Sequence, residues 1–309
     1  MKPIHCLGVA VVDALSGELA SYPAPRVRVQ VSTDRVSFLP GGGAVNTSSA
    51  LARMGFSTAI FSKIGKDLMG SFLLKELEKC GVDTRNVCVS EHDSTPFTFV
   101  GIHPKGDRTF IHTPGANKTF SLEDLSVERL LDTDFLLYQD LWVMPELDGR
   151  SGAEILSMAR RAGAVTLLDE CYGLGPKVDV LQSMLPSCDY FLPSMDDVRV
   201  LYPDSAPDDL ASRFLDCGAG TVVLKMGPDG CLLAKGSDRA HLPALPSSVV
   251  DTTGAGDCWN AGFIAGLAMG EGPEMAARIG NACAAFSIES VGGSTGVPGY
   301  AAVLARARK

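Results

Sequence analysis

The chain has 309 residues, of which 46% are hydrophobic, so it can form one large α/β domain or two ordinary ones. A formal net charge of −9 argues against a nucleic-acid-binding surface. The nine cysteines are scattered and include no Cys-x-x-Cys pair, which argues against a zinc site. The sequence has no signal-peptide pattern and no apolar run of about 18 residues, so neither secretion nor a membrane span is expected. Together these features favour a cytoplasmic protein.

The N-terminal segment predicts one buried strand and the beginning of a small separate sheet. The apolar run from Cys6 to Val12 is strand-length and ends at Asp13. An acidic residue in that position is a usual ligand in open α/β sheets, although a turn residue fits equally well. Residues 27–31 alternate apolar and polar side chains, as a one-sided strand does. A hairpin predicted over 95–112 would complete the same small sheet.

A glycine run then precedes the first predicted helix. Gly41-Gly42-Gly43-Ala44-Val45-Asn46 leads into a helix that reaches about Met54. Glycines let the main chain approach a ligand closely, and Asn46 offers a polyol both a donor and an acceptor. The simpler alternative is a glycine turn with an asparagine cap.

Strands and helices alternate regularly over the following two hundred residues, which predicts a parallel sheet covered on both faces. No linker or repeat interrupts the pattern, so residues 1–309 are predicted to form one domain. The predicted strands are 58–64, 135–138, 164–169, 189–193 and 221–226, and the predicted helices are 71–80, 151–162, 207–217 and one from 257.

Polar residues follow several of these strands, at the edge where ligands gather in such sheets. Gln139, Asp140 and Asp169 are in such positions. Ser194 and Asp197 begin the next helix, where a capped helix start would look the same. Lys225 ends a strand and precedes the turn Gly227-Pro-Asp-Gly230, where an ordinary surface lysine is the alternative.

The most informative stretch is Asp251-Thr-Thr-Gly-Ala-Gly-Asp257, which follows a β-like run ending at Val249-Val250 and enters a helix. A glycine turn at a helix N-terminus presents several main-chain N–H groups, which suits an anion. Asp257 beside such a turn can take the proton of a hydroxyl group as that group attacks. A plain helix cap is the alternative for Asp257.

The string from Asp251 to Asp257, together with Gly-Gly-x-x-x-Asn ending at Asn46, resembles the two signatures of the ribokinase-like (phosphofructokinase-B) family of sugar and nucleoside kinases. The resemblance implies a three-layer α/β/α fold with a mostly parallel central sheet and a small β-sheet lid. The lid would be formed by about 14–39 and 95–112.

The resemblance also implies an ATP-dependent kinase that phosphorylates a hydroxyl of a sugar, a related polyol or a sugar acid. Asp257 would be the general base and Gly254, Ala255 and Gly256 the anion hole. The acceptor would be bound by Asp13, Gly42, Asn46, Arg108, Asp140 and Asp257. ATP would lie along Ser194, Lys225, Gly227, Gly230 and Asn281.

Two metal ions follow from the same resemblance. Mg²⁺ would be held through water by Asp197, and K⁺ by residues near Asp251 and Thr253. The family usually has Asn-x-x-Glu where this chain has Ser194 and Asp197, so the carboxylate sits on a shorter stem. That departure concerns the geometry of the metal site.

Two rival functions stay open at this point. A nucleoside kinase of the same family would favour aromatic residues on the lid, where the segment 24–38 offers only Phe38. A sugar sensor that kept the fold without catalysis would explain the unusual Ser194 and Asp197. The lid has edge strands that can pair between subunits, so a homodimer through the lid is also expected.

Overall fold

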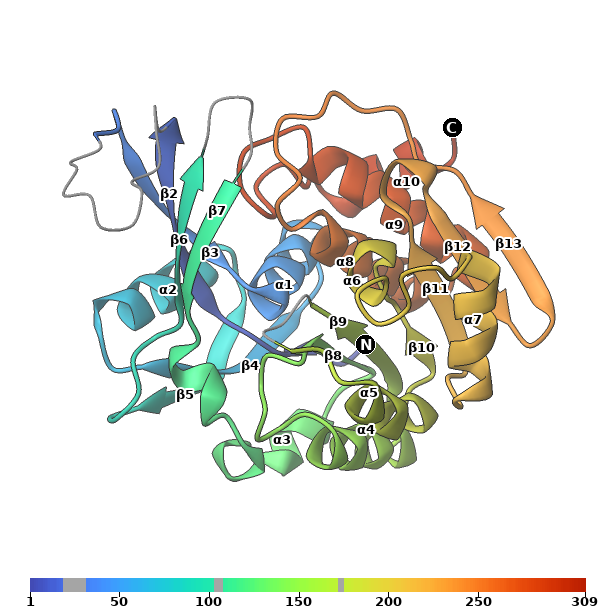
Figure 1. Cartoon of the computed structure of the whole chain (residues 1–309), viewed down its shortest axis with the longest axis horizontal. Coiled ribbons are helices and arrows are strands. Elements are labelled where there is room, and N and C mark those ends of the chain that lie inside the picture. The colour runs from blue at the N-terminus through green and yellow to red at the C-terminus, as the bar shows by residue number, and fades with distance from the viewer. Residues whose placement is uncertain (19–31, 103–107, 172–174) are drawn as a thin grey trace.

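A computed structural model describes residues 1–18, 32–102, 108–171 and 175–309, and for Arg108 it describes only the main chain (Figure 1). The strand predicted at 27–31 lies outside the described residues. Two sheets are present, a large one at the centre and a smaller one that stands beside it.

The large sheet has nine strands and is mostly parallel, as predicted. The three strands at one edge pair antiparallel, and the remaining neighbours pair parallel. In spatial order the strands are β13 (Asp238–Leu242), β12 (Cys231–Lys235), β11 (Thr221–Lys225), β10 (Tyr190–Phe191), β9 (Val165–Glu170), β8 (Phe135–Leu141), β1 (Ile4–Leu7), β4 (Thr58–Gly65) and β5 (Asp83–Ser90).

Helices cover both faces of this sheet, which confirms the three-layer α/β/α prediction. Successive side chains of a strand enter opposite cores, as Leu136 and Leu137 of β8 do. One core is closed by α1 (Gly43–Arg53), α2 (Leu68–Lys79), α8 (Ala255–Ala268), α9 (Pro273–Ser287) and α10 (Tyr300–Ala307). The other is closed by α3 (Val127–Leu131), α4 (Arg150–Arg161), α5 (Val178–Met184) and α7 (Pro207–Asp216), with the short α6 (Met195–Val198) before α7.

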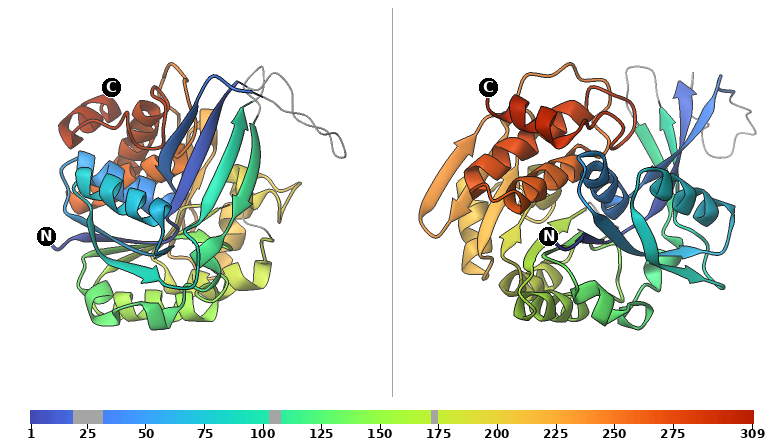
Figure 2. Two further views of the ribbon diagram at one scale, coloured as in Figure 1. Left: turned by 90° about the vertical axis from the view of Figure 1, so that its left-hand side faces the viewer. Right: turned by 180° about the vertical axis from the view of Figure 1, so that it is seen from behind.

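The small sheet combines two segments that lie far apart in the sequence, as predicted. Its spatial order is β3 (Val36–Gly41), β2 (Val11–Glu18), β6 (Phe97–Ile102) and β7 (Arg108–Thr113). Figure 2 shows that it projects from the body of the molecule next to α1. β3 continues directly into α1, so the small sheet is joined to the first glycine run.

Two strand predictions are wrong. The run from Cys6 to Val12 is not one strand, because β1 ends at Leu7 in the large sheet and β2 begins at Val11 in the small one. Asp13 therefore lies inside β2 instead of at the end of a central strand. The segment ending at Val249 and Val250 is irregular, and both valines are more than half exposed.

Within the described residues, none of the helices is both long enough and apolar enough to span a bilayer.

Candidate active site

The second glycine motif forms the tight start of α8. Gly254 is its N-cap and has a left-handed main chain with φ 69°. A Cβ there would lie 2.8 Å from Cα of Gly293 and 3.0 Å from Nδ2 of Asn46, so only glycine fits. The first amides of a helix lack intrahelical acceptors, and in this turn the Ala255 N–H donates to the carbonyl of Thr252. A glycine turn at a helix start suits an anion, and in this structure the Ala255 N–H is already engaged within the turn.

Asp257, in the first turn of α8, is held by side chains from two other elements. Asn46 Nδ2 of α1 donates to its Oδ2 at 2.8 Å, and Gln139 Nε2 of β8 lies 3.4 Å from its Oδ1. Thr47 Oγ1 donates to its main-chain carbonyl at 3.0 Å. The two glycine motifs, 211 residues apart, therefore meet where α1 packs beside α8 (Figure 1).

The surroundings of Asp257 change its acidity. Burial raises the pKa of its carboxyl to about 6, and the charge of Asp169 acts in the same direction. The hydrogen bond from Asn46 and the charge of Lys225 oppose this rise. Asp257 is therefore a stronger base than an ordinary aspartate, while its ionised form prevails at neutral pH.

Asp140, in β8, fixes the start of α1 through hydrogen bonds to the main chain. Its Oδ2 accepts the N–H of Val9 at 2.8 Å and its Oδ1 accepts the N–H of Gly43 at 3.1 Å. Asp140 itself has φ 61°, a region that non-glycine residues rarely adopt. Burial, followed by the charge of Asp257, raises the pKa of Asp140 to about 8. Gly42, the N-cap of α1, has φ 94°, and a Cβ there would overlap the carbonyl of Val9.

Asp13 belongs to a cross-strand row in the small sheet. It pairs with Leu39 on one side and Thr98 on the other, and Thr98 Oγ1 is 3.0 Å from Nδ1 of His112. The Leu39 side chain reaches within 3.7 Å of a Cβ built on Gly292, so this face is turned toward the body of the molecule. Burial raises the pKa of Asp13 to about 6.

Lys225 is buried at the end of β11 and is not a surface lysine. Its Nζ lies 2.9 Å from Oδ1 of Asp169 and 3.2 Å from Oδ1 of Asn260. A Cβ on Gly256 would lie 3.6 Å from the same Nζ, which puts the ammonium group directly beside the glycine turn. Burial lowers the pKa of Lys225, but the neighbouring carboxylates of Asp169 and Glu170 outweigh burial and raise it.

Acidic residues surround the start of α6. Ser194, its N-cap, donates its N–H to Oε1 of Glu170 at 2.7 Å and forms an isolated bridge with Lys225. Burial raises the pKa of Asp197 to about 6, against the charge of Lys225. Glu170, which ends β9, was missed by the sequence reasoning. Its only signal was a second acid directly after Asp169 at a strand end.

The remaining predicted residues lie around this centre with different partners. Gly227 and Gly230 both have positive φ, in the turn between β11 and β12. Asn281 accepts from Trp259 Nε1 at 2.7 Å and donates to the main-chain carbonyls of Leu242, which ends β13, and of Pro243, so its amide connects α9 to its neighbours. Asp251 accepts the N–H groups of Thr253 and Gly292, each at 3.0 Å. The side chain of Arg108 lies outside what the structure describes.

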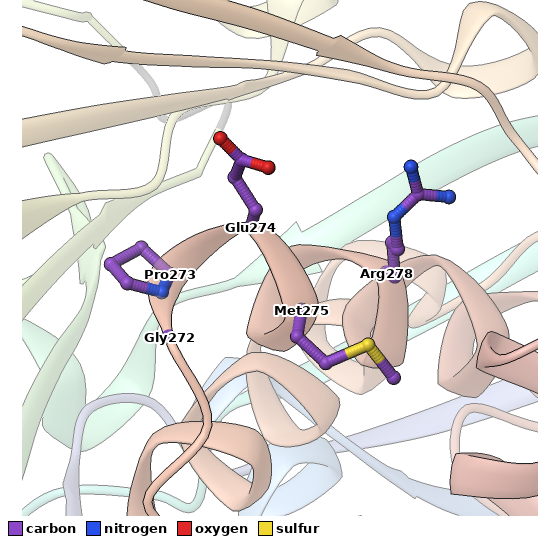
Figure 3. Close-up of a pocket in the computed structure, with 5 residues that line it drawn as sticks. All are labelled: Gly272, Pro273, Glu274, Met275 and Arg278. Atoms are coloured by element: carbon purple, nitrogen blue, oxygen red, sulfur yellow. The ribbon is translucent and has the colours of Figure 1, made fainter.

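A cavity elsewhere on the molecule is unrelated to this centre. It measures about 420 Å³ and is lined by residues at the start of α9, namely Gly272, Pro273, Glu274, Met275 and Arg278 (Figure 3). The length of α8, about 21 Å at 1.5 Å per residue, separates this place from the glycine turn.

Comparisons with known proteins agree with the geometry. The model of the "pfkB family carbohydrate kinase" matches residues 5–299. An Archaeoglobus fulgidus protein named "uncharacterized sugar kinase" is 30% identical over 262 residues, which cover 80% of this chain and 98% of that protein.

Solved structures share the fold over the whole chain. The ribokinase of Thermotoga maritima superposes with a TM-score of 0.87 at 24% identity and covers all of both chains. A putative ribokinase II from E. coli, solved with ATP and Mg²⁺, has a TM-score of 0.82 at 22% identity and covers all of this chain and 99% of the other.

Proposed function

Because this chain belongs to the pfkB family of carbohydrate kinases, and is thus a phosphotransferase with an alcohol group as acceptor, we propose that it transfers the γ-phosphoryl group of ATP to a hydroxyl of a sugar, a related polyol or a sugar acid. The observation that carries the proposal is the position of Asp257, a half-buried carboxylate with a pKa of about 6 at a glycine turn. Asn46 and Gln139 hold it from two sides.

Asp257 is the general base of the proposed reaction. It takes the proton of the acceptor hydroxyl as the oxygen attacks the γ-phosphorus, and the bond to the β-phosphate oxygen of ATP breaks. With donors on both of its oxygens, the carboxylate has a fixed orientation before the acceptor arrives. Such orientation is a large part of the rate gain in phosphoryl transfer.

Charge on the transferring group is balanced at the turn. In the proposed reaction the main-chain N–H groups of Gly254 and Gly256 face that charge as it develops, and the N–H of Ala255 would join them after leaving the carbonyl of Thr252. Lys225, beside the turn, adds a positive potential without leaving its carboxylate partner Asp169. In a buried site such charges act more strongly than in water.

Asp197 would hold the magnesium ion that accompanies ATP, and this ion would neutralise part of the phosphate charge. Asp197 fits this role because its half-buried carboxylate lies beside Ser194 and Lys225, at the edge where the phosphates would lie. Glu170 in the same place has an oxygen without a hydrogen-bond partner among the described residues, which also suits a cation. Asp251 and Thr253, next to the 290–298 loop, remain our proposal for a potassium site.

The acceptor would lie between the small sheet and the start of α1. Asp13 would accept hydrogen bonds from its hydroxyls, while Gly42 and Asn46 would face it from the body of the molecule. Asp140 supports this side by fixing the main chain at Gly43. Arg108, in β7, remains a proposed contact for an acidic or phosphorylated acceptor.

The nucleotide would occupy the other side of the turn. Ser194, Lys225 and the turn from Gly227 to Gly230 would border its phosphates. Asn281 would act near the adenine through the packing of α9, since its side-chain amide is engaged within the protein.

We further propose that the small sheet is a lid within the single domain 1–309 and pairs two copies of the chain. Its face opposite Asp13 carries an apolar cross-strand row of Phe38, Ala14, Phe99 and Ile111. Phe38 is 47% and Ile111 58% exposed, so a partner lid could cover them. Molar mass from light scattering tests the dimer. The nine scattered cysteines of the sequence suit our assignment of the protein to the cytoplasm.

The function is tested by ADP release from Mg·ATP across a panel of sugars, sugar acids, polyols and nucleosides, with the isosteric variant Asp257→Asn alongside. We expect one sugar-like acceptor to stimulate the wild type strongly and the variant about 10²- to 10⁴-fold less. A nucleoside as the best acceptor would select the nucleoside kinase. Sugar binding seen by thermal shift without ADP release would select the sensor.

A further inference from the structure

One buried carboxylate oxygen near the proposed magnesium site has no protein partner. Glu170 is 5% exposed, and its Oε1 accepts the N–H of Ser194. Its Oε2 is buried and receives no hydrogen bond from any residue that the structure describes. Leaving such an atom unpaired is destabilising, and more so when it is charged. An oxygen in this state is typical of a place that a ligand or a cation completes.

The charges around Glu170 are also unbalanced. Of these charges, that of Asp197 acts on it most strongly, followed by Asp169. Lys225 is bound to Asp169 at 2.9 Å, and the ion pairs found among the described residues include neither Glu170 nor Asp197. Two neighbouring carboxylates therefore lack a cation of their own, which a divalent ion would supply.

Building on the proposed function, we propose that Glu170 is the second carboxylate that holds the magnesium ion of Mg·ATP, together with Asp197. The sequence explains why a second one is needed. Where the family pattern has glutamate, this chain has Asp197, whose stem is one methylene shorter. Glu170 on the adjacent β9 restores an oxygen ligand, directly or through water, because Ser194 connects the end of β9 to the start of α6.

Glu170→Gln should affect the affinity for nucleotide differently with and without magnesium. The glutamine keeps an oxygen for the Ser194 N–H but removes the negative charge. Binding of a non-hydrolysable ATP analogue (AMP-PNP) in EDTA should stay equal or become tighter, since a repelling charge is gone. Binding of Mg·AMP-PNP should weaken, so that the gain in affinity due to magnesium falls about 10- to 100-fold.

Isothermal titration calorimetry of the full-length wild type and variants measures this gain. Asp196→Asn is the matched control, because it also removes one negative charge, next to Asp197 in α6, but at a side chain that is 93% exposed. Its gain should equal that of the wild type. In the double variant Glu170→Gln/Asp197→Glu, the longer side chain should recover part of the lost gain.

Three results would overturn the proposal. Magnesium could raise the affinity of Glu170→Gln for AMP-PNP as much as it raises that of the wild type. Glu170→Gln could lose affinity for AMP-PNP equally with and without magnesium, or the double variant could bind Mg·AMP-PNP as weakly as Glu170→Gln does. The second of these would mean that Glu170 only supports the local fold. A wild type that does not bind AMP-PNP at all would instead reject the kinase function. The readout is binding, so it does not depend on knowing the acceptor.

Discussion

Lowering the pH should inactivate the proposed kinase by protonating Asp257. A general base must be ionised, and burial raises the pKa of this carboxyl from 3.8 to about 6. At pH 5 a group with a pKa of 6 is only about one tenth ionised, whereas an ordinary aspartate is still more than about nine tenths ionised. We therefore expect kcat/KM for the acceptor to fall about tenfold between pH 8 and pH 5.

The assay is the initial rate of ADP release at saturating Mg·ATP and low acceptor concentration, followed over that pH range. Asp257→Asn is the control, and its residual rate should show no step near pH 6. Asn46→Ala removes the hydrogen bond that lowers the pKa of Asp257, so the step in that variant should move to higher pH. A wild-type kcat/KM that stays level down to pH 5, or the same step in Asp257→Asn, would refute the assignment of the base.

Substitutions of Asp13, Lys225 and Gly280, two of them with a control variant, test other parts of the structure. Asp13→Asn should raise KM for the acceptor about tenfold or more with little change in kcat, because a hydrogen bond to a charged group contributes about 1.5–3 kcal/mol. Lys225→Met should lower the free energy of unfolding by about 3–5 kcal/mol, because it leaves Asp169 buried and unpaired. Adding Asp169→Asn should restore much of that stability in denaturant titrations but not the activity. Gly280→Ala should cost about 1–3 kcal/mol, because its Cβ would lie 2.7 Å from the indole ring on α8. Gly272→Ala, with nothing within 4 Å, should leave the melting temperature unchanged.

The parts of the fold that the sequence predicted correctly have strong local signals. The helix after the first glycine run begins at Gly43, and the helix of the second motif begins at Ala255, because glycine turns mark both starts. The strands β8, β9 and β11 are buried on both faces, so they are nearly continuous apolar runs. Such runs can be recognised without knowledge of their partners.

The wrong predictions concern segments whose secondary structure is determined by tertiary contacts. The run from Cys6 to Val12 is apolar throughout, yet the chain changes sheets at Gly8, where a Cβ would lie 2.7 Å from Oδ2 of Asp140. Val250 looks like the end of a strand, but its N–H donates to the carbonyl of Ile288 at 2.7 Å instead of to a neighbouring strand. Nothing local in either stretch reveals a partner more than 35 residues away.

The same distinction applies to the site. Motifs identified Asp257 and Asn46 separately, but only the fold brings the amide of one to the carboxylate of the other. Spacing could not reveal that Lys225 is bound to Asp169, nor that one oxygen of Glu170 has no partner in the part of the chain that the structure describes. Pairings between strand ends depend on the order of strands in the sheet, which single-sequence patterns do not specify.

The buried acidic residues of the site lower the free energy of unfolding, and a bound ligand can offset part of this loss. Asp257, Asp140 and Asp197 have raised pKa values of about 6, about 8 and about 6. An acid with a raised pKa binds its proton more tightly in the folded state, so its contribution to stability falls as the pH rises from 3.8 through these values. At neutral pH all three groups therefore lower the stability of the empty protein, Asp257 and Asp197 mainly as carboxylates and Asp140 mainly as the protonated acid. A cation and hydrogen-bond donors from substrates would remove part of that cost, which is the behaviour expected of groups kept for chemistry and not for folding.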